Sequence, residues 1–142
     1  MTDDLLRLRT ARALGWVCVR ERMGVLGSVY QRWEKDGTLA TTVTFMNDDI
    51  AYDVIRYDGP MPAYGESWAS CEEIDAACKE RGWRAQIDMD GDETRVFLFT
   101  TINGLIGTRL SAAYGPTFPA AFAEAFCEAV EAASIPSTGD VD

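Results

Sequence analysis

The sequence predicts an α+β fold in which an antiparallel sheet of about five to seven strands is flanked by about three helices, in an αββαββα-like order. Two observations carry this prediction. Three segments have the apolar spacing of amphipathic helices, and the stretches between them are β-rich runs joined by glycine-containing turns. Because 47% of the 142 residues are hydrophobic, the chain can fill one core. We therefore expect a single domain over residues 1–133, followed by a disordered tail at 134–142.

The first helix is predicted over residues 4–14. Thr2 or Asp3 supplies the N-cap, acidic residues occupy the first turn, and Gly15 takes the position after the C-terminus. The face with spacing i, i+4, i+7 and i+8 consists of Leu6, Thr10, Ala13 and Leu14. This helix is expected to pack on the sheet.

Three strands follow, at residues 16–20, 28–33 and 38–45, where β-branched and aromatic residues concentrate. Asp36-Gly37 lies between the last two strands, and Asp-Gly is a favoured hairpin turn. An antiparallel meander is therefore predicted. Segment 47–57 stays open between a strand and a short helix capped by Asp48, because its apolar residues fit both spacings.

The second helix is predicted to start at a capping box formed by Ser70 and Glu73, and to close at Gly82. Its inner face is expected to contain Ile74, Ala77, Cys78 and Arg81. A hairpin follows at residues 83–89 and 94–102, joined by an acidic turn, and a further strand is expected at 106–113. No repeat with a period of 20 to 50 residues is evident.

The third helix is predicted over residues 118–133, with Thr117 as its cap and Pro136 as a stop signal. Its apolar face is broad and its polar face is a narrow stripe of glutamates, so the helix should be mostly buried. The apolar residues are Phe122, Ala125, Phe126, Ala129, Val130 and Ala133.

Several of these features together resemble the phage ABA sandwich domain. They are Ala13-Leu14-Gly15-Trp16, the Pro62-x-Tyr64 loop, a Ser-capped helix closing with Arg81-Gly82-Trp83, and an Ala-rich C-terminal helix that contains Cys127. The resemblance is strongest over residues 62–132, and 38–60 looks like an insertion relative to it. It implies a sheet flanked by helices, a phage or prophage origin, and no assigned chemistry.

The formal net charge of −10 is distributed unevenly. Residues 1–35 hold seven bases and four acids, net +3, so residues 36–142 carry −13 from 6 bases and 19 acids. This balance argues against direct binding to nucleic acid, because neutralising phosphates needs an excess of bases. The acidic N-terminus differs from a signal peptide and no apolar run could span a bilayer, so we expect a cytoplasmic protein without a membrane partner. The resemblance to the phage domain implies that the cell is a bacterial host.

Several chemistries are disfavoured by residue type. The absence of histidine removes Ser-His-Asp and Cys-His catalysis and the commonest metal ligand. The cysteines, Cys18, Cys71, Cys78 and Cys127, lack C-x-x-C spacing and are expected to be buried thiols. The acidic turn fails the EF-hand pattern, which requires glycine where Glu93 stands. We therefore expect no enzyme activity, no cofactor and no metal.

Three groups of residues remain as candidate interaction sites. A basic patch is predicted from Arg9, Arg12, Arg20, Arg22 and Arg32. An acidic surface is predicted from Asp88, Asp90, Asp92, Glu93, Glu124, Glu128 and Glu131. Trp33, Tyr64 and Trp68 are candidate aromatic anchors, although core packing is expected for at least one of them.

The favoured function is that of a non-enzymatic phage or prophage accessory protein that binds another protein. One alternative is an acidic inhibitor that imitates DNA against a host nucleic-acid-targeting defence system. The other is a small-ligand binding protein or an enzyme with a cryptic site. The partner is unknown, with a host defence complex or a second copy of the chain among the options.

Overall fold

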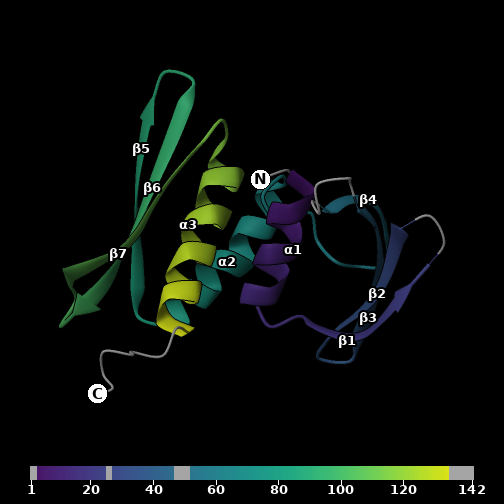
Figure 1. The fold of residues 1–142 in the computed structure, drawn as a ribbon. Helices are drawn as coiled ribbons and strands as arrows, with labels where there is room; N and C mark the ends of the chain where they lie inside the picture. The colour runs from purple at the N-terminus through teal and green to yellow at the C-terminus, as the bar shows by residue number, and fades with distance from the viewer. Residues whose placement is uncertain (1–2, 25–26, 47–51, 135–142) are drawn as a thin grey trace, which may run out of the picture.

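The computed structural model describes residues 3–24, 27–46 and 52–134, which form three helices and seven strands (Figure 1). In chain order the elements are α1 (Asp3–Ala13), β1 (Val17–Met23), β2 (Ser28–Lys35), β3 (Thr38–Met46), β4 (Tyr52–Asp58), α2 (Trp68–Glu80), β5 (Trp83–Asp90), β6 (Glu93–Ile102), β7 (Leu105–Gly115) and α3 (Phe118–Ser134). The α+β class with antiparallel strands and three helices is confirmed. Of the tail expected at 134–142, Ser134 is the last residue of α3, and residues 135–142 lie outside the described residues.

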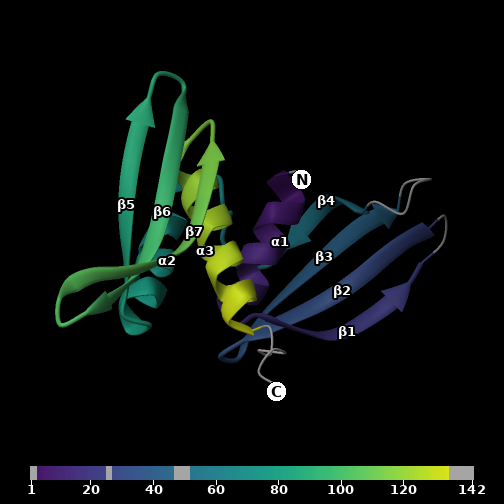
Figure 2. The same cartoon turned by 60° about the vertical axis from the view of Figure 1, so that its left-hand side comes forward.

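The strands form two separate sheets, and the helices lie between them (Figures 1 and 2). β1 to β4 make one antiparallel meander and β5 to β7 make the other. Helix α3 packs on β6 and β7, while α1 lies between α3 and β4. Each sheet therefore has one face on the helix layer and one outer face. None of the helices in the described residues combines the length and apolar character needed to cross a bilayer.

The four-stranded sheet contains the meander expected from the sequence. Lys35 pairs with Thr38 across the Asp36-Gly37 turn, in which both turn residues have positive φ, at 50° and 83°. This is the geometry that a two-residue hairpin of this twist requires. The open segment resolves in favour of a strand from residue 52, because β4 pairs with β3; residues 47–51 lie outside the described residues.

The start of α2 differs from the sequence prediction. Ser67, and not Ser70, is the N-cap, and its hydroxyl accepts a hydrogen bond from the Ser70 backbone N–H at 3.2 Å. The capping box fails because Glu73 binds Lys35 and Tyr64 instead. At the other end, Gly82 follows the helix with φ of +75° as predicted.

Two residues predicted on inner helix faces are exposed. The Arg81 guanidinium lies over the Trp83 ring, 5.1 Å from its centroid, so only its stem can pack. Ala133 stands in the last turn of α3 and is exposed. The rest of the α3 apolar face is buried, and the Thr117 hydroxyl accepts from the Ala120 N–H at 3.3 Å, which confirms the cap.

Helix α1 joins two hydrophobic cores. Leu6 belongs to the core between α2, α3 and the three-stranded sheet, whereas Leu8 and Ala11 belong to the core against the four-stranded sheet. Arg7 adds to the second contact, because its guanidinium lies 3.5 Å from the Tyr57 ring centroid and donates to the Met61 carbonyl. This 11-residue helix therefore has apolar side chains in both cores and links them.

The chain also contains an internal repeat with a period of 67 residues, which is longer than the roughly 20 to 50 residues typical of repeat proteins. The first unit, residues 3–46, and the second unit, residues 68–115, each contain a helix followed by three antiparallel strands. Equivalent positions with constant offset are Gly15 and Gly82, Trp16 and Trp83, Val29 and Val96, Tyr30 and Phe97, Asp36 and Asn103, and Gly37 and Gly104. Asp36 and Asn103 are also the two non-glycine residues with positive φ in the described chain. The two units therefore share both pattern and turn geometry.

Candidate functional site

The outer face of the three-stranded sheet carries aromatic side chains. On the central strand β6, Val96 and Leu98 are 0% exposed and face the helices. Because side chains alternate along a strand, Phe97 and Phe99 project from the opposite face, where both remain partly exposed. The solvent face of an antiparallel sheet is ordinarily polar, so two phenylalanines in this position are unusual.

Neighbouring strands place these aromatics within three rows of cross-strand partners. The arginine row is Arg84, Phe99 and Arg109; the central row is Gln86, Phe97 and Ala112; the tyrosine row is Asp88, Arg95 and Tyr114. We refer to the three rows together as the outer face. A shallow hollow of about 450 Å³ lies here, lined by Gln86, Ile87, Asp88, Phe97, Phe99 and Arg109.

The two ends of the outer face differ in charge. Arg95 is held at the acidic end: its Nε donates to Glu93 Oε1 at 3.2 Å, and its guanidinium lies 5.6 Å from the Tyr114 ring centroid. The hydrogen bond to Glu93 raises the pKa of Arg95. Within the described parts of the chain, neither Arg84 nor Arg109 forms an ion pair. The arginine row is thus the unneutralised basic end.

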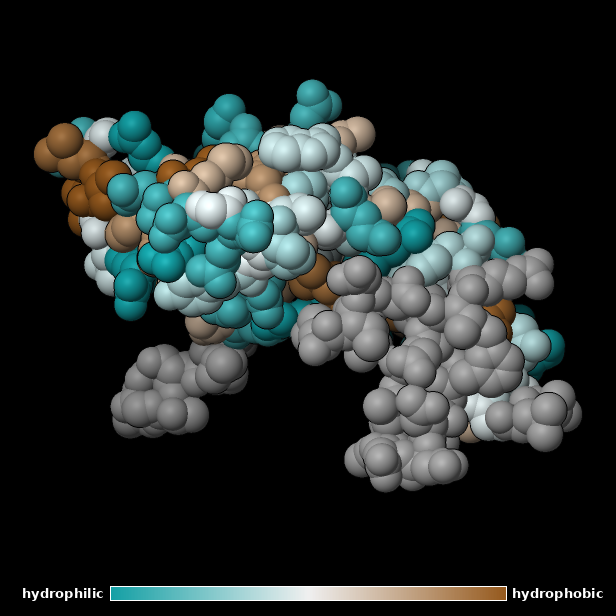
Figure 3. Space-filling view, turned by 90° about the horizontal axis from the view of Figure 1, so that it is seen from above, coloured by the Kyte–Doolittle hydropathy of each residue, from teal (hydrophilic) through white to brown (hydrophobic). Residues whose placement is uncertain are grey.

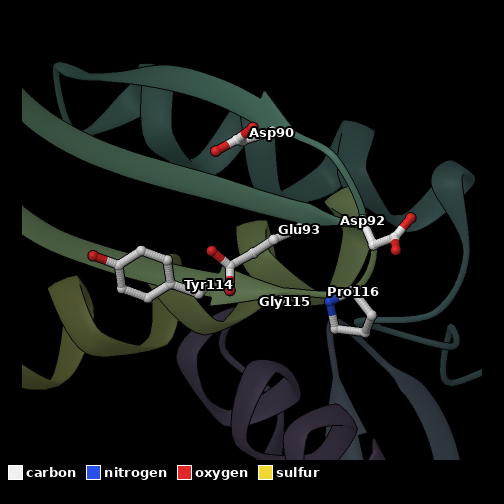
Figure 4. Close-up of a pocket in the computed structure, with 6 residues that line it drawn as sticks. All are labelled: Asp90, Asp92, Glu93, Tyr114, Gly115 and Pro116. Atoms are coloured by element: carbon white, nitrogen blue, oxygen red, sulfur yellow. The ribbon is translucent and has the colours of Figure 1, made fainter.

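A second hollow, of about 530 Å³, lies beyond the tyrosine row and is shown in Figure 4. It is lined by Asp90, Asp92, Glu93, Tyr114, Gly115 and Pro116. The three carboxylates point in different directions around the β5–β6 turn and do not converge (Figure 4). In keeping with this, no group of three or more potential ligands among the described residues could hold a metal ion.

The turn between β6 and β7 forms an apolar tip, composed of Ile102, Leu105 and Ile106. These side chains are 62%, 72% and 49% exposed, although they are aliphatic. Figures 1 and 2 show this end of the sheet extending away from the helix layer. In Figure 3, hydrophobic side chains gather on the same side of the molecule. The tip extends the outer face past its arginine row.

No family model matches the chain, and no curated protein or solved structure matches it either. The resemblance to the phage domain therefore stays a prediction.

The five arginines of the predicted basic patch do not lie together. Arg9 forms an ion pair with Glu131 on α3 at 2.6 Å, and the Arg12 guanidinium lies 5.0 Å from the ring centroid of the buried Trp33. The other three are on the solvent-exposed side of the four-stranded sheet, where Arg20 is opposite Arg32 and Arg22 is opposite Tyr30. Because α1 faces inward, its arginines cannot join those of the strands.

The predicted acidic surface is likewise divided between two elements. Asp88, Asp90, Asp92 and Glu93 belong to the β5–β6 hairpin, and the three glutamates are on α3. Glu131 binds Arg9, which lowers the pKa of that carboxyl. Burial, together with the charge of Glu124, raises the pKa of Glu128. Part of this charge is therefore neutralised or half-buried.

Two of the three predicted aromatic anchors are wrong, because Trp33 and Tyr64 are 0% exposed. The Trp33 indole N–H donates to Thr42 Oγ1 at 3.0 Å. The Tyr64 hydroxyl donates to Glu73 at 2.7 Å and accepts from Trp16 at 3.1 Å, so its polar tip is satisfied inside the core. Trp68 is 64% exposed, and its ring stacks on Phe118 at 5.2 Å.

The cysteines are all free thiols: Cys71, Cys78 and Cys127 are buried, and Cys18 is only half-buried. Phe97 and Phe99 were not among the surface residues predicted from the sequence. Their signal was present, since Val96 to Phe99 are four consecutive apolar residues within a strand, and a strand with one buried face should alternate. Which of the two pairs faces outward was decided by packing against α3.

Proposed function

We propose that the chain acts by protein–protein binding and not by catalysis, and that its binding surface is the outer face of the three-stranded sheet. The observation that carries this is the arginine row, in which Phe99 stands between two exposed arginines. Aromatic residues and arginine are the types enriched at protein interfaces and in their energetic centres.

The outer face also has the composition of an interface beyond that row. Phe97 adds a second aromatic, Gln86 and Asp88 supply polar groups at the margin, and the apolar tip continues the surface. Exposed apolar groups rimmed by polar residues are typical of protein contact sites. The apolar area supplies affinity and the separated charges supply orientation.

A protein suits this face better than a nucleic acid does. The whole chain carries a net charge of −10, and carboxylates occupy the end of the outer face beside the tyrosine row. A phosphate backbone would be attracted by Arg84 and Arg109 but repelled by Asp88 and Asp90. A protein surface can present both signs of charge.

Photo-crosslinking in cells tests the proposal. The crosslinking residue p-benzoylphenylalanine replaces Phe97 in one variant and Tyr30 in the control, because these residues are equivalent in the two units and both lie on outer faces. We expect irradiation to join a protein to position 97 and none to position 30. Adducts of equal yield at both positions, or none at position 97, would contradict the proposal.

A further inference from the structure

We propose that the protein bound by the outer face is a second copy of this chain, packed face to face about a two-fold axis. This inference rests on the proposed function and names the partner of the same surface. In a symmetric dimer the same patch meets itself, so the patch must be complementary to its own rotated image. The order of charges on the outer face meets this condition in only one orientation.

A face-to-face dimer has two possible orientations. The two-fold axis lies between the two packed sheets and runs either along the strands or across them. An axis along the strands would place each row on the same row of the second copy. Arg84 would then meet Arg109 of the other copy, and the acidic turns of the two copies would lie against each other. Both contacts bring like charges together, so this orientation is unfavourable. An axis across the strands reverses the order of the rows, and this orientation is the one that we propose.

With the axis passing through the central row, the arginine row of one copy lies over the tyrosine row of the other. Arg84 is then opposite Asp88 of the second copy, because both are two residues from Gln86 on β5. On β6, Phe99 is opposite Arg95 by the same count. On β7, Arg109 is opposite Tyr114, with one bulge between the rows. One ion pair and two cation–π contacts form, and each occurs twice.

The same rotation brings the ends of the sheet together. Ile102 lies five residues after Phe97 and Asp92 five residues before it, so the apolar tip of one copy reaches the β5–β6 end of the other. The hollow there includes Tyr114, Gly115 and Pro116, which offer a partly apolar surface (Figure 4). The dimer would thus cover the exposed aliphatic residues of the tip. Packed sheets are about 10 Å apart, a gap that long arginine side chains span.

The area of the outer face limits the expected affinity of the dimer. Three strands about 4.8 Å apart and about ten residues long provide roughly 500 Å² on each copy. This is below the roughly 800 Å² per partner of a standard stable interface, so the dimer should depend on concentration. Opposite charges would then determine much of its specificity.

Charge exchange at Arg84 and Asp88 tests the dimer. Both side chains are exposed, and they are four residues apart on β5, about 13 Å, so neither supports the other within one copy. We expect Arg84→Asp and Asp88→Arg each to weaken self-association at least tenfold in sedimentation equilibrium. The double variant R84D/D88R should restore dimerisation, because its opposite charges again face each other. Arg22→Asp, on the other sheet, is the matched control and should leave the dimer unchanged.

The outcomes separate this inference from the proposed function. Loss in both single variants with recovery in the double variant supports the dimer, whereas loss without recovery, or a monomer at all concentrations, overturns it. A monomer that still forms a photo-adduct with a different protein at position 97 overturns the dimer but keeps the proposed function. Binding of a fluorescent single-stranded oligonucleotide that Arg84→Asp abolishes, with no self-association, would overturn both. Near-UV circular dichroism confirms that each variant is folded.

Discussion

The two units of the chain share one pattern but present different outer faces. In the first unit the central strand β2 shows Tyr30 and Arg32 outward, and in the second unit β6 shows Phe97 and Phe99. Both units keep the Gly-Trp step after the helix and the two-residue turn with positive φ. Residues that fix the backbone are thus kept while outward side chains differ. This contrast is why we place the proposed binding surface on the second unit.

The units also differ in how their helices are buried. Helix α1 is apolar on two sides and packs against both α3 and the four-stranded sheet, whereas the buried residues of α2 belong to one core. Helix α3 has no equivalent inside the two units and fills the space against β6 and β7. The units are therefore not independent, because the core of the three-stranded sheet contains Leu6 of α1 and the apolar residues of α3.

The largest expected effect comes from emptying each core in turn. Trp33 and Leu98 are both 0% exposed, one in each core. We expect Trp33→Ala to lower the free energy of unfolding by about 3–5 kcal/mol and Leu98→Ala by about 2–5 kcal/mol. Because α1 joins the cores, each variant should unfold in one transition. Urea unfolding followed by tryptophan fluorescence and far-UV circular dichroism measures this, and separated transitions would show that the units fold independently.

Matched turn variants sharpen the comparison of the units. Gly37 and Gly104 have φ of +83° and +81°, and neither has a heavy atom within 4 Å of the position that a Cβ would occupy. Gly37→Ala and Gly104→Ala should therefore cost only the backbone strain, about 1–2 kcal/mol each. Thermal unfolding of both variants gives the two values. A clearly larger loss in one unit would mean that the two turns are not equivalent.

A smaller effect is expected at the ion pair between α1 and α3. Glu131 binds Arg9 but is 49% exposed, so Glu131→Gln should lower stability by only about 0.5 kcal/mol at neutral pH. The pKa of Glu131 is lowered below its ordinary value of 4.5, so this contribution is present above that value and is lost as the pH falls.

Glu128 on the same helix is the control for the Glu131 prediction, because its pKa is shifted in the opposite direction. Burial raises the pKa of Glu128, so its charged form is disfavoured in the folded state. Glu128→Gln should therefore not reduce stability at neutral pH. Unfolding measured from about pH 3 to about pH 7, which spans the ordinary glutamate pKa of 4.5, compares the two variants. Equal losses in both would contradict the assignment.

The smallest effect concerns thiol reactivity and leaves stability unchanged. Burial raises the pKa of Cys78 to about 12 and that of Cys127 to about 11, and it also raises the pKa of the buried Cys71. Because the thiolate is the form that reacts, and these three thiols stay protonated, the three cysteines should resist Ellman's reagent in the folded protein. Half-buried Cys18 should react first. Cys18→Ser should remove the fast phase, and a persistent fast phase would mean that a core cysteine is accessible.

Much of the secondary structure was predictable from local signals. The Asp36-Gly37 turn, the glycine after α2 and the cap at Thr117 follow from the conformations that those residues favour. The strands and α3 follow from apolar spacing. The cap of α2 was not predictable, because Ser67 and Ser70 are three residues apart and each can cap; the partners of Glu73 on other elements decided between them.

The sequence by itself therefore determined the α+β class, the turns and most of the elements, because these depend on neighbours along the chain. Tertiary structure alone decided that the strands divide into two sheets around the helices, that Trp33 and Tyr64 lie inside, and that Phe97 and Phe99 lie outside. An apolar residue carries no local information about which of two faces will be covered. Packing of α3 against Val96 and Leu98 made that choice and left Phe97 and Phe99 on the outer face, which is the candidate binding surface.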